Sequence, residues 1–154
     1  MKKINNNFFK SAMSKFPTGV TIISINKNND YIGKTVNSFA SLSLKPPLVL
    51  FSLDKKSSSL NDYTQSSYIG INILSTKQKK LSNHFATKRP KWGLTKFFLS
   101  KNDVPLIKDS VVNMNCNNIK TILQGDHLIF ICKILEIQII NKLKPLIYIN
   151  SDYL

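Results

Sequence analysis

The residues best suited to chemistry in this 154-residue chain lie in two segments. The first, residues 33–43, is rich in small hydroxyl and amide side chains and lies between two apolar stretches. The second is Gly125-Asp126-His127, where one of only two histidines follows a carboxylate at the start of an apolar run. The first segment predicts a polar loop that could hold a flat polar cofactor. The second could serve a site that takes a hydride donor.

Within the predicted loop, Thr35, Asn37 and Ser38 offer donors and acceptors short enough to meet the polar edge of a ring without crowding its faces. The alternative is a loop whose Asn and Ser side chains only satisfy their own backbone. Composition alone leaves both open.

A second set of polar residues predicts a phosphate site. Lys55-Lys56-Ser57-Ser58-Ser59 places cations and hydroxyls before a predicted short helix, where backbone amides also favour anions. Lys88, Arg89 and Lys91 could add positive charge from another loop. Both segments have an alternative interpretation as solvated basic surface.

His127 could position a substrate or donate a hydrogen bond as charge develops, or it could make only a structural hydrogen bond. His84 lies in a predicted helix and is interpreted as a surface or packing residue. No cluster has metal-ligand spacing, so no metal is expected, and no nucleophile elbow is present.

The hydrophobic pattern predicts a mainly β fold around these residues. Proline 17 ends a predicted amphipathic helix, residues 27–30 form a turn, and Ser75 with Gln78 forms a capping box before a helix that carries Leu81 and Phe85. Residues 87–100 are expected to form a loop. The expected strands are 20–25, the segment from Tyr31, 48–53, 68–74, 116–122, 128–140 and 145–148. About seven strands, a few short helices and no βαβ alternation predict a closed antiparallel barrel.

Length and composition predict a single domain that spans residues 1–154. No apolar run is long enough to cross a membrane and no signal core follows the N-terminus, so we expect a cytoplasmic protein. Cys116 and Cys132 are expected to be buried, reduced thiols. The net charge of +14 would attract a polyanion, but the lysines are dispersed, which makes nucleic acid an unlikely partner.

Taken in order, these segments resemble the flavin reductase family with its FMN-binding split-barrel fold. The resemblance covers roughly residues 8–153. It rests on Phe16-Pro17-Thr18-Gly19-Val20, Gly33 to Phe39, Pro46 to Val49, Ser57-Ser58, Asn72 and Leu74 with Gln78, Phe85-Ala86, Pro105-Leu106, Cys116, Gly125 to His127, and Pro145-Leu146-Ile147-Tyr148.

The resemblance implies a homodimeric enzyme that uses NADH or NADPH to reduce FMN or FAD, often for a separate monooxygenase. His127 would meet the nicotinamide. The flavin would be held by Thr35, Val36, Asn37, Ser38, Phe39, Ser57, Ser58, Phe85, Ala86, Lys91 and Tyr153. The cofactors would carry the chemistry and the protein would orient them.

The sequence departs from the family pattern in two places. Thr87 replaces a common glycine, and residues 89–92 form an atypical loop. Asn150-Ser151-Asp152 replaces small or basic residues before Tyr153, and a carboxylate at Asp152 would be unfavourable near a nucleotide phosphate. The flavin site is therefore better supported than the nucleotide site.

Two other functions remain open at this point. A flavoprotein of the same barrel could retain its flavin as an electron carrier or act on another substrate. A basic nucleic-acid-binding barrel would show steeply salt-dependent binding and aromatic side chains exposed on a sheet.

Overall fold

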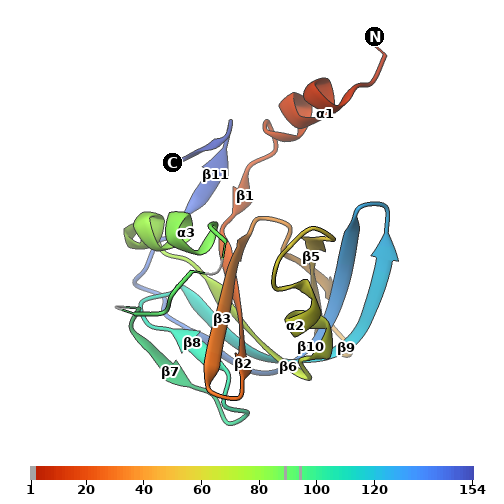
Figure 1. Cartoon of the computed structure of the whole chain (residues 1–154). Helices are drawn as coiled ribbons and strands as arrows, with labels where there is room; N and C mark the ends of the chain where they lie inside the picture. Colours follow the sequence, from red (N-terminus) through yellow and green to blue (C-terminus); the bar gives the residue numbers. More distant parts are fainter. Residues whose placement is uncertain (1–2, 89, 94) are drawn as a thin grey trace.

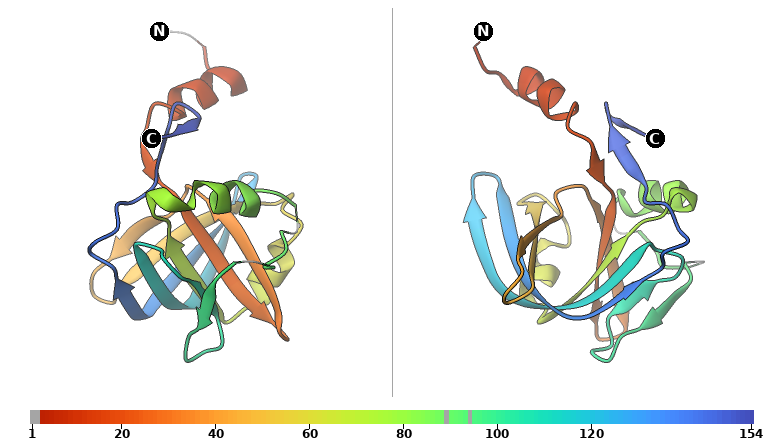
Figure 2. Two further views of the ribbon diagram at one scale, coloured as in Figure 1. Left: turned by 90° about the vertical axis from the view of Figure 1, so that its left-hand side faces the viewer. Right: turned by 180° about the vertical axis from the view of Figure 1, so that it is seen from behind.

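A long, curved antiparallel sheet forms the body of the molecule (Figures 1 and 2). The computed structural model describes residues 3–88, 90–93 and 95–154. The main sheet has the strand order β3-β2-β6-β9-β10-β5-β4. Its strands are β2 (Thr21–Lys27), β3 (Asp30–Val36), β4 (Ala40–Ser43), β5 (Leu48–Asp54), β6 (Tyr68–Ile73), β9 (Val112–Gln124) and β10 (His127–Ile139).

Within the described residues, two small sheets and three α-helices complete the fold. One sheet has the order β1-β11-β12 and the other pairs β7 with β8. These strands are β1 (Thr18–Gly19), β7 (Phe97–Leu99), β8 (Pro105–Ile107), β11 (Ile147–Ile149) and β12 (Asp152–Tyr153). The helices are α1 (Asn6–Met13), α2 (Leu60–Gln65) and α3 (Lys79–Phe85), with the 3-10 turn η1 (Thr76–Gln78) before α3.

The mainly β prediction is confirmed, but closure of the barrel is not. The main sheet curls strongly (Figure 2). Its strand order starts at β3 and ends at β4, and the pairings among the described residues do not join these two edges. Six of the seven expected strands correspond to β2, β3, β5, β6, β9 and β10 of the main sheet, and the seventh, 145–148, corresponds to β11 of a small sheet. β4 was not expected as a strand. The additional strands are short, so the periodicity of the sequence gives them little signal.

Two hairpins follow the turn chemistry of the sequence. Asn28 and Asn29 both have positive φ, as the tight turn between β2 and β3 requires, and this turn falls where it was predicted. Gly125 has φ +61° in the turn between β9 and β10. Each of these two strands has 13 residues: β9 extends beyond its predicted limits of 116–122, and β10 matches the predicted strand 128–140 to within one residue at each end.

The predicted polar loop over 33–43 is wrong in extent. Residues 33–36 belong to β3 and residues 40–43 to β4, so only Asn37, Ser38 and Phe39 connect the two strands. Lys34 and Thr35 pair with Ile23 and Ile22 of β2. Both faces of β3 are covered: Val36 packs in the apolar core on one side, and Gly33 and Thr35 contact α3 on the other.

Two apolar clusters form the core. The larger lies inside the curled sheet and includes both cysteines, which are buried and free, as the sequence predicted. The smaller joins Phe85 of α3 to Ile22 of β2 and to Trp92 in the 87–100 segment. That segment was expected to be a loop, but it also contains β7. The smaller cluster holds α3 against the sheet.

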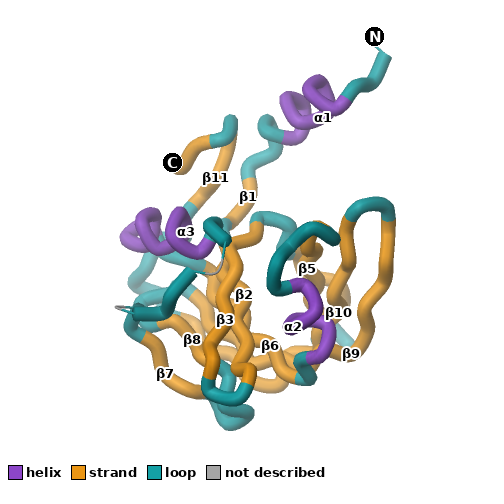
Figure 3. The backbone as a smooth tube through the Cα atoms, viewed as in Figure 1, coloured by secondary structure: helices purple, strands orange, loops and turns teal. Residues whose placement is uncertain are grey.

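The N- and C-terminal segments stand off the body together. Figure 3 shows α1 projecting away from the sheet, with β1 and β11 side by side at its base. No residue of α1 is buried. The helix is shorter than expected, since it ends at Met13 and not at Phe16. Across the described ranges, no helix combines the length and apolar character that crossing a membrane demands.

Candidate functional site

A groove of about 500 Å³ lies between the end of β3, helix α3 and the C-terminal hairpin β11–β12. We call it the α3 groove. Figure 1 shows the backbone of β3, α3 and β11, from which most of the lining residues come. Its lining residues are Val20, Thr35, Val36, Asn37, Lys79, Ser82, Asn83, Ala86, Tyr148, Ser151, Asp152 and Tyr153. Five of the predicted flavin-site residues are therefore together: Thr35, Val36, Asn37, Ala86 and Tyr153.

A capping box places helix α3 beside the groove. The side chain of Gln78 accepts the backbone N–H of Ser75 at 3.0 Å, as the sequence predicted, and donates to the carbonyl of Lys108 at 2.8 Å. The box satisfies a backbone group that would otherwise be unpaired at the start of the helix. Because Gln78 also bonds to the carbonyl of Lys108, the start of α3 is attached to the residue that follows β8.

Hydrogen bonds link the three walls of the groove. The hydroxyl of Thr35 donates to the carbonyl of Ser82 at 2.7 Å, joining β3 to α3. The Tyr153 hydroxyl lies 2.8 Å from the Ser82 hydroxyl and donates to Oδ1 of Asn83 at 2.8 Å, joining the C-terminal hairpin to the same helix. This chain of contacts fixes the relative positions of the walls.

Ser82 and Asn83 were missed by sequence reasoning. Ser82 is fully buried and precedes Phe85 by three residues, so both side chains lie on one face of α3. That spacing was a usable signal. Asn83 had none, because its contact comes from a strand about 70 residues further along the chain.

Phe85 lies in the core beneath the α3 groove. Its ring is fully buried and packs edge-on against Trp92 at a centroid distance of 5.1 Å. A Cβ at Gly33 would lie 2.5 Å from the Phe85 ring, closer than real contacts allow. Glycine at this position therefore lets β3 approach the ring directly.

Ser38 and Phe39 connect β3 to β4 next to the groove. The Ser38 hydroxyl donates to the carbonyl of Ser52 and accepts its N–H, both at 3.0 Å. Phe39 packs against the larger core cluster. In this arrangement the two side chains position Asn37, which lines the groove.

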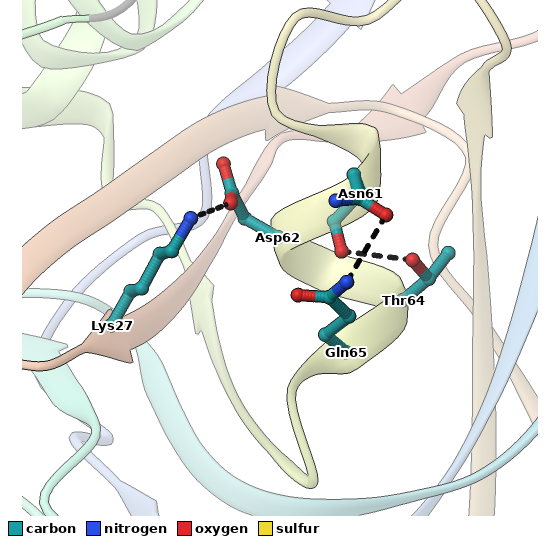
Figure 4. A network of polar contacts seen from close by, with 5 residues as sticks. All are labelled: Lys27, Asn61, Asp62, Thr64 and Gln65. Atoms are coloured by element: carbon teal, nitrogen blue, oxygen red, sulfur yellow. Dashed lines mark hydrogen bonds and ion pairs between the residues drawn. The ribbon is translucent and has the colours of Figure 1, made fainter.

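A second groove of about 700 Å³, the α2 groove, brings Ser58 and Lys91 together. The 27–34 region, Ser59 and Asp62 of α2, and Trp92 also line it. Lys27 forms an ion pair with Asp62, so its charge is already compensated (Figure 4). Arg89, an expected source of positive charge, lies outside the described residues.

The serines of the predicted phosphate site do not cap α2 through a side chain. Ser59 is the N-cap residue, but its side chain makes no capping hydrogen bond. Within the described chain, the buried Oγ of Ser57 has no hydrogen-bond partner, and neither has the buried Nε1 of Trp92. Unpaired buried polar atoms are costly unless a ligand or water satisfies them.

His127 lies at the start of β10 and lines neither groove. Its Nδ1 is 2.7 Å from Oδ1 of Asp126, and its side chain is 44% exposed. The hydrogen bond from His127 lowers the pKa of the Asp126 carboxyl, so Asp126 stays ionised. The carbonyl of Asp126 accepts the N–H of Lys55 at 2.9 Å, which places the histidine near the turn that leads to Ser57.

No group of three or more His, Cys, Asp or Glu side chains within residues 3–88, 90–93 and 95–154 is arranged to hold a metal ion. The polar groups of the two grooves are amides, hydroxyls, ammonium groups and carboxylates, and the Asp62 and Asp152 carboxylates are paired with lysines. This donor set suits an organic ligand with polar edges and negative charge.

Comparison with known proteins shows which family the chain belongs to. The family model of the flavin reductase like domain matches residues 13–154, and the chain belongs to this family. It is 34% identical over 132 residues to the FMN reductase (NADH) SmoA of Agrobacterium fabrum, covering 86% of this chain and 76% of that protein.

Two further similarities support this assignment. The chain is 31% identical over 154 residues to HsaB of Mycobacterium tuberculosis, the reductase subunit of a flavin-dependent monooxygenase, with coverage of 98% and 82%. The solved structure of flavin reductase PheA2 superposes with a TM-score of 0.90 at 35% identity, covering 98% of this chain and 97% of that one. The resemblance stated from the motifs is thereby confirmed.

Proposed function

We propose that this chain is a cytoplasmic NAD(P)H-dependent flavin reductase, which transfers a hydride from NADH or NADPH to FMN or FAD and supplies the reduced flavin to a monooxygenase. The observation that carries the proposal is the α3 groove in a chain of this family, lined by predicted flavin-site residues from three elements. The name of SmoA, an FMN reductase (NADH), supports the reduction of flavin by a nicotinamide donor. The name of HsaB, the reductase subunit of a flavin-dependent monooxygenase, supports the supply of reduced flavin to such an enzyme.

The residues present fit a flavin nucleotide. The Oγ of Ser57 and the Nε1 of Trp92 are buried and have no partner among the described residues, so each can donate a hydrogen bond to a ligand. Ser58 and Lys91 line the adjacent α2 groove and add a hydroxyl and a cation. In the α3 groove, Thr35 and Asn37 offer short polar groups to the edge of a ring.

The flavin, when bound, supplies the ring that accepts the hydride. Thr35, Asn37 and Tyr153 hold and orient that ring through the walls of the α3 groove. In this proposal His127 orients the nicotinamide and donates a hydrogen bond from Nε2 while charge develops, and its contact with Asp126 through Nδ1 holds the ring. Orientation of this kind lowers the entropic cost of bringing two reactants together.

The experiment is a steady-state assay of NADH or NADPH oxidation by the purified chain with added FMN or FAD. Turnover that depends on free flavin supports a reductase that releases its product. Flavin that stays bound through purification and is not exchanged would instead identify the carrier function. Absence of flavin binding would overturn the proposal.

We further propose that the functional unit is a homodimer. Residues on and beside α1 expose large apolar surfaces, namely Ile4, Phe8, Phe9, Met13 and Phe16. A helix of eight residues is unstable in water without tertiary packing, and none of its residues is buried in a single chain. A second copy that covers this helix would provide the missing contacts.

A further inference from the structure

The α3 groove contains one acidic and one basic side chain, and they face each other. Asp152 comes from the C-terminal hairpin and Lys79 from the first turn of α3. The Lys79 ammonium lies 3.6 Å from Oδ1 of Asp152 and 5.1 Å from the centroid of the Tyr153 ring. The positive charge of Lys79 is therefore partly compensated by a carboxylate and an aromatic face.

The Asp152 carboxylate is held in place and stays exposed to the groove. Its Oδ1 accepts the N–H of Tyr153 at 2.7 Å. The Asp152 side chain is 78% exposed. This backbone hydrogen bond and the nearby Lys79 lower the pKa of the carboxyl, so Asp152 is ionised at neutral pH.

The Tyr153 hydroxyl connects this carboxylate to the rest of the site. Because Tyr153 binds Ser82 and Asn83 on α3, its neighbour Asp152 occupies a defined position at one wall of the groove. A nucleotide that lies over a flavin ring at the Thr35 and Asn37 wall and extends toward the C-terminal hairpin meets this negative charge.

NADH and NADPH differ only at the adenosine ribose, where NADPH carries a 2′-phosphate. A carboxylate accepts hydrogen bonds from the vicinal hydroxyls of an unmodified ribose, and nucleotide-binding sites use an acidic residue in this way to select NAD. The same carboxylate repels a 2′-phosphate, and an already paired lysine offers that phosphate little compensation.

We infer that Asp152 meets the adenosine ribose of the nicotinamide nucleotide in the α3 groove and makes this chain prefer NADH over NADPH. The inference rests on the proposed function. Asp152, which replaces a small or basic residue of the family pattern, would then determine whether the chain uses NADH or NADPH.

The test compares kcat/KM for NADH and NADPH in the wild-type chain, in Asp152→Asn and in Asp152→Arg. Wild type should prefer NADH. Asp152→Asn should shift the ratio toward NADPH on the order of tenfold, and Asp152→Arg should shift it further. Asp103→Asn is the matched control, because it removes the same charge from an exposed turn outside the groove and should leave the ratio unchanged.

A wild type that prefers NADPH, or an unchanged ratio in Asp152→Asn, would overturn the inference while leaving the reductase function standing. If no flavin is reduced with either donor, the proposed function fails. The binding constants of NADH and NADPH for the same variants, measured by fluorescence titration, then decide whether Asp152 discriminates between the two nucleotides.

Discussion

At the scale of single residues, Tyr153 connects the C-terminal hairpin to helix α3. Its hydroxyl bridges Ser82 and Asn83, and its ring lies against Lys79 and packs edge-on with Tyr148. The sequence indicated Tyr153 as a candidate by resemblance. It could not indicate the Ser82 and Asn83 contacts, because they form between segments about 70 residues apart.

Tyr153→Phe should weaken flavin binding and lower the free energy of unfolding by about 1 kcal/mol, the net value of a typical hydrogen bond. Removing the hydroxyl breaks the Tyr153 contacts with Ser82 and Asn83 but keeps the ring. Flavin titration and chemical denaturation measure the two effects. Tyr148→Phe is the control, since Tyr148 lines the same groove without a side-chain hydrogen bond among the described residues.

His127→Ala should lower the rate of hydride transfer by on the order of 100-fold while flavin affinity changes little. The reason is that His127 lies outside both grooves and acts on the nicotinamide in our account. Stopped-flow reduction and flavin titration separate these quantities. His127→Gln retains a hydrogen-bond donor and should recover part of the rate; an unaltered rate in the alanine variant would remove His127 from the mechanism.

The two thiols predict a pH dependence of stability. Burial raises the pKa of Cys132 to about 12 and also raises that of Cys116. A raised pKa means that the folded state favours the protonated thiol, so this contribution is fully present below the ordinary thiol pKa of about 8.5 and is lost as the pH rises toward the folded values.

Native protein should therefore react slowly with a thiol reagent at about pH 8, and rapidly once it is unfolded. Cys132→Val should reduce the loss of thermal stability on the alkaline side. Fast alkylation of the folded chain would show that the thiols are accessible and would contradict their burial.

At the scale of elements, the contact between β3 and α3 determines the shape of the groove. Gly33→Ala places a methyl group against the Phe85 ring and should cost roughly 1–3 kcal/mol in the free energy of unfolding. Gly19→Ala is the control, because an added Cβ there meets no atom within 4 Å. Thermal denaturation measures both, and the double variant Gly33→Ala with Phe85→Leu should recover part of the loss. Equal melting temperatures for the two alanine variants would contradict this packing.

Much of the element pattern was readable from the sequence. Alternation and turn residues predicted the β2–β3 hairpin, the long β9–β10 hairpin and the capping box, because each depends on neighbouring residues. The boundary of the 33–43 segment was misjudged, since its strand character comes from pairing with β2 and β5, which composition does not encode. The separation of Ser58 and Lys91 from Thr35 into a second groove also depends on tertiary contacts.

At the scale of the whole molecule, helix α1 projects from the body with its apolar side chains exposed, and we propose that a second copy of the chain covers them. We expect a homodimer by size-exclusion chromatography with light scattering. Replacing Phe8 and Phe9 together by serine should shift the mass toward the monomer, because it removes exposed apolar surface that a second copy would cover. The matched control replaces Leu123 by serine, an exposed residue at the far end of the β9–β10 hairpin. A monomeric wild type would contradict the homodimer.

The central claim is that this chain passes a hydride from a nicotinamide donor to a flavin. The most direct measurement is anaerobic mixing of the flavin-loaded protein with NADH while the absorbance of oxidised flavin is followed. Our account predicts rapid loss of that absorbance, with one flavin reduced per NADH consumed. Bound flavin that stays oxidised in the presence of both NADH and NADPH would contradict it.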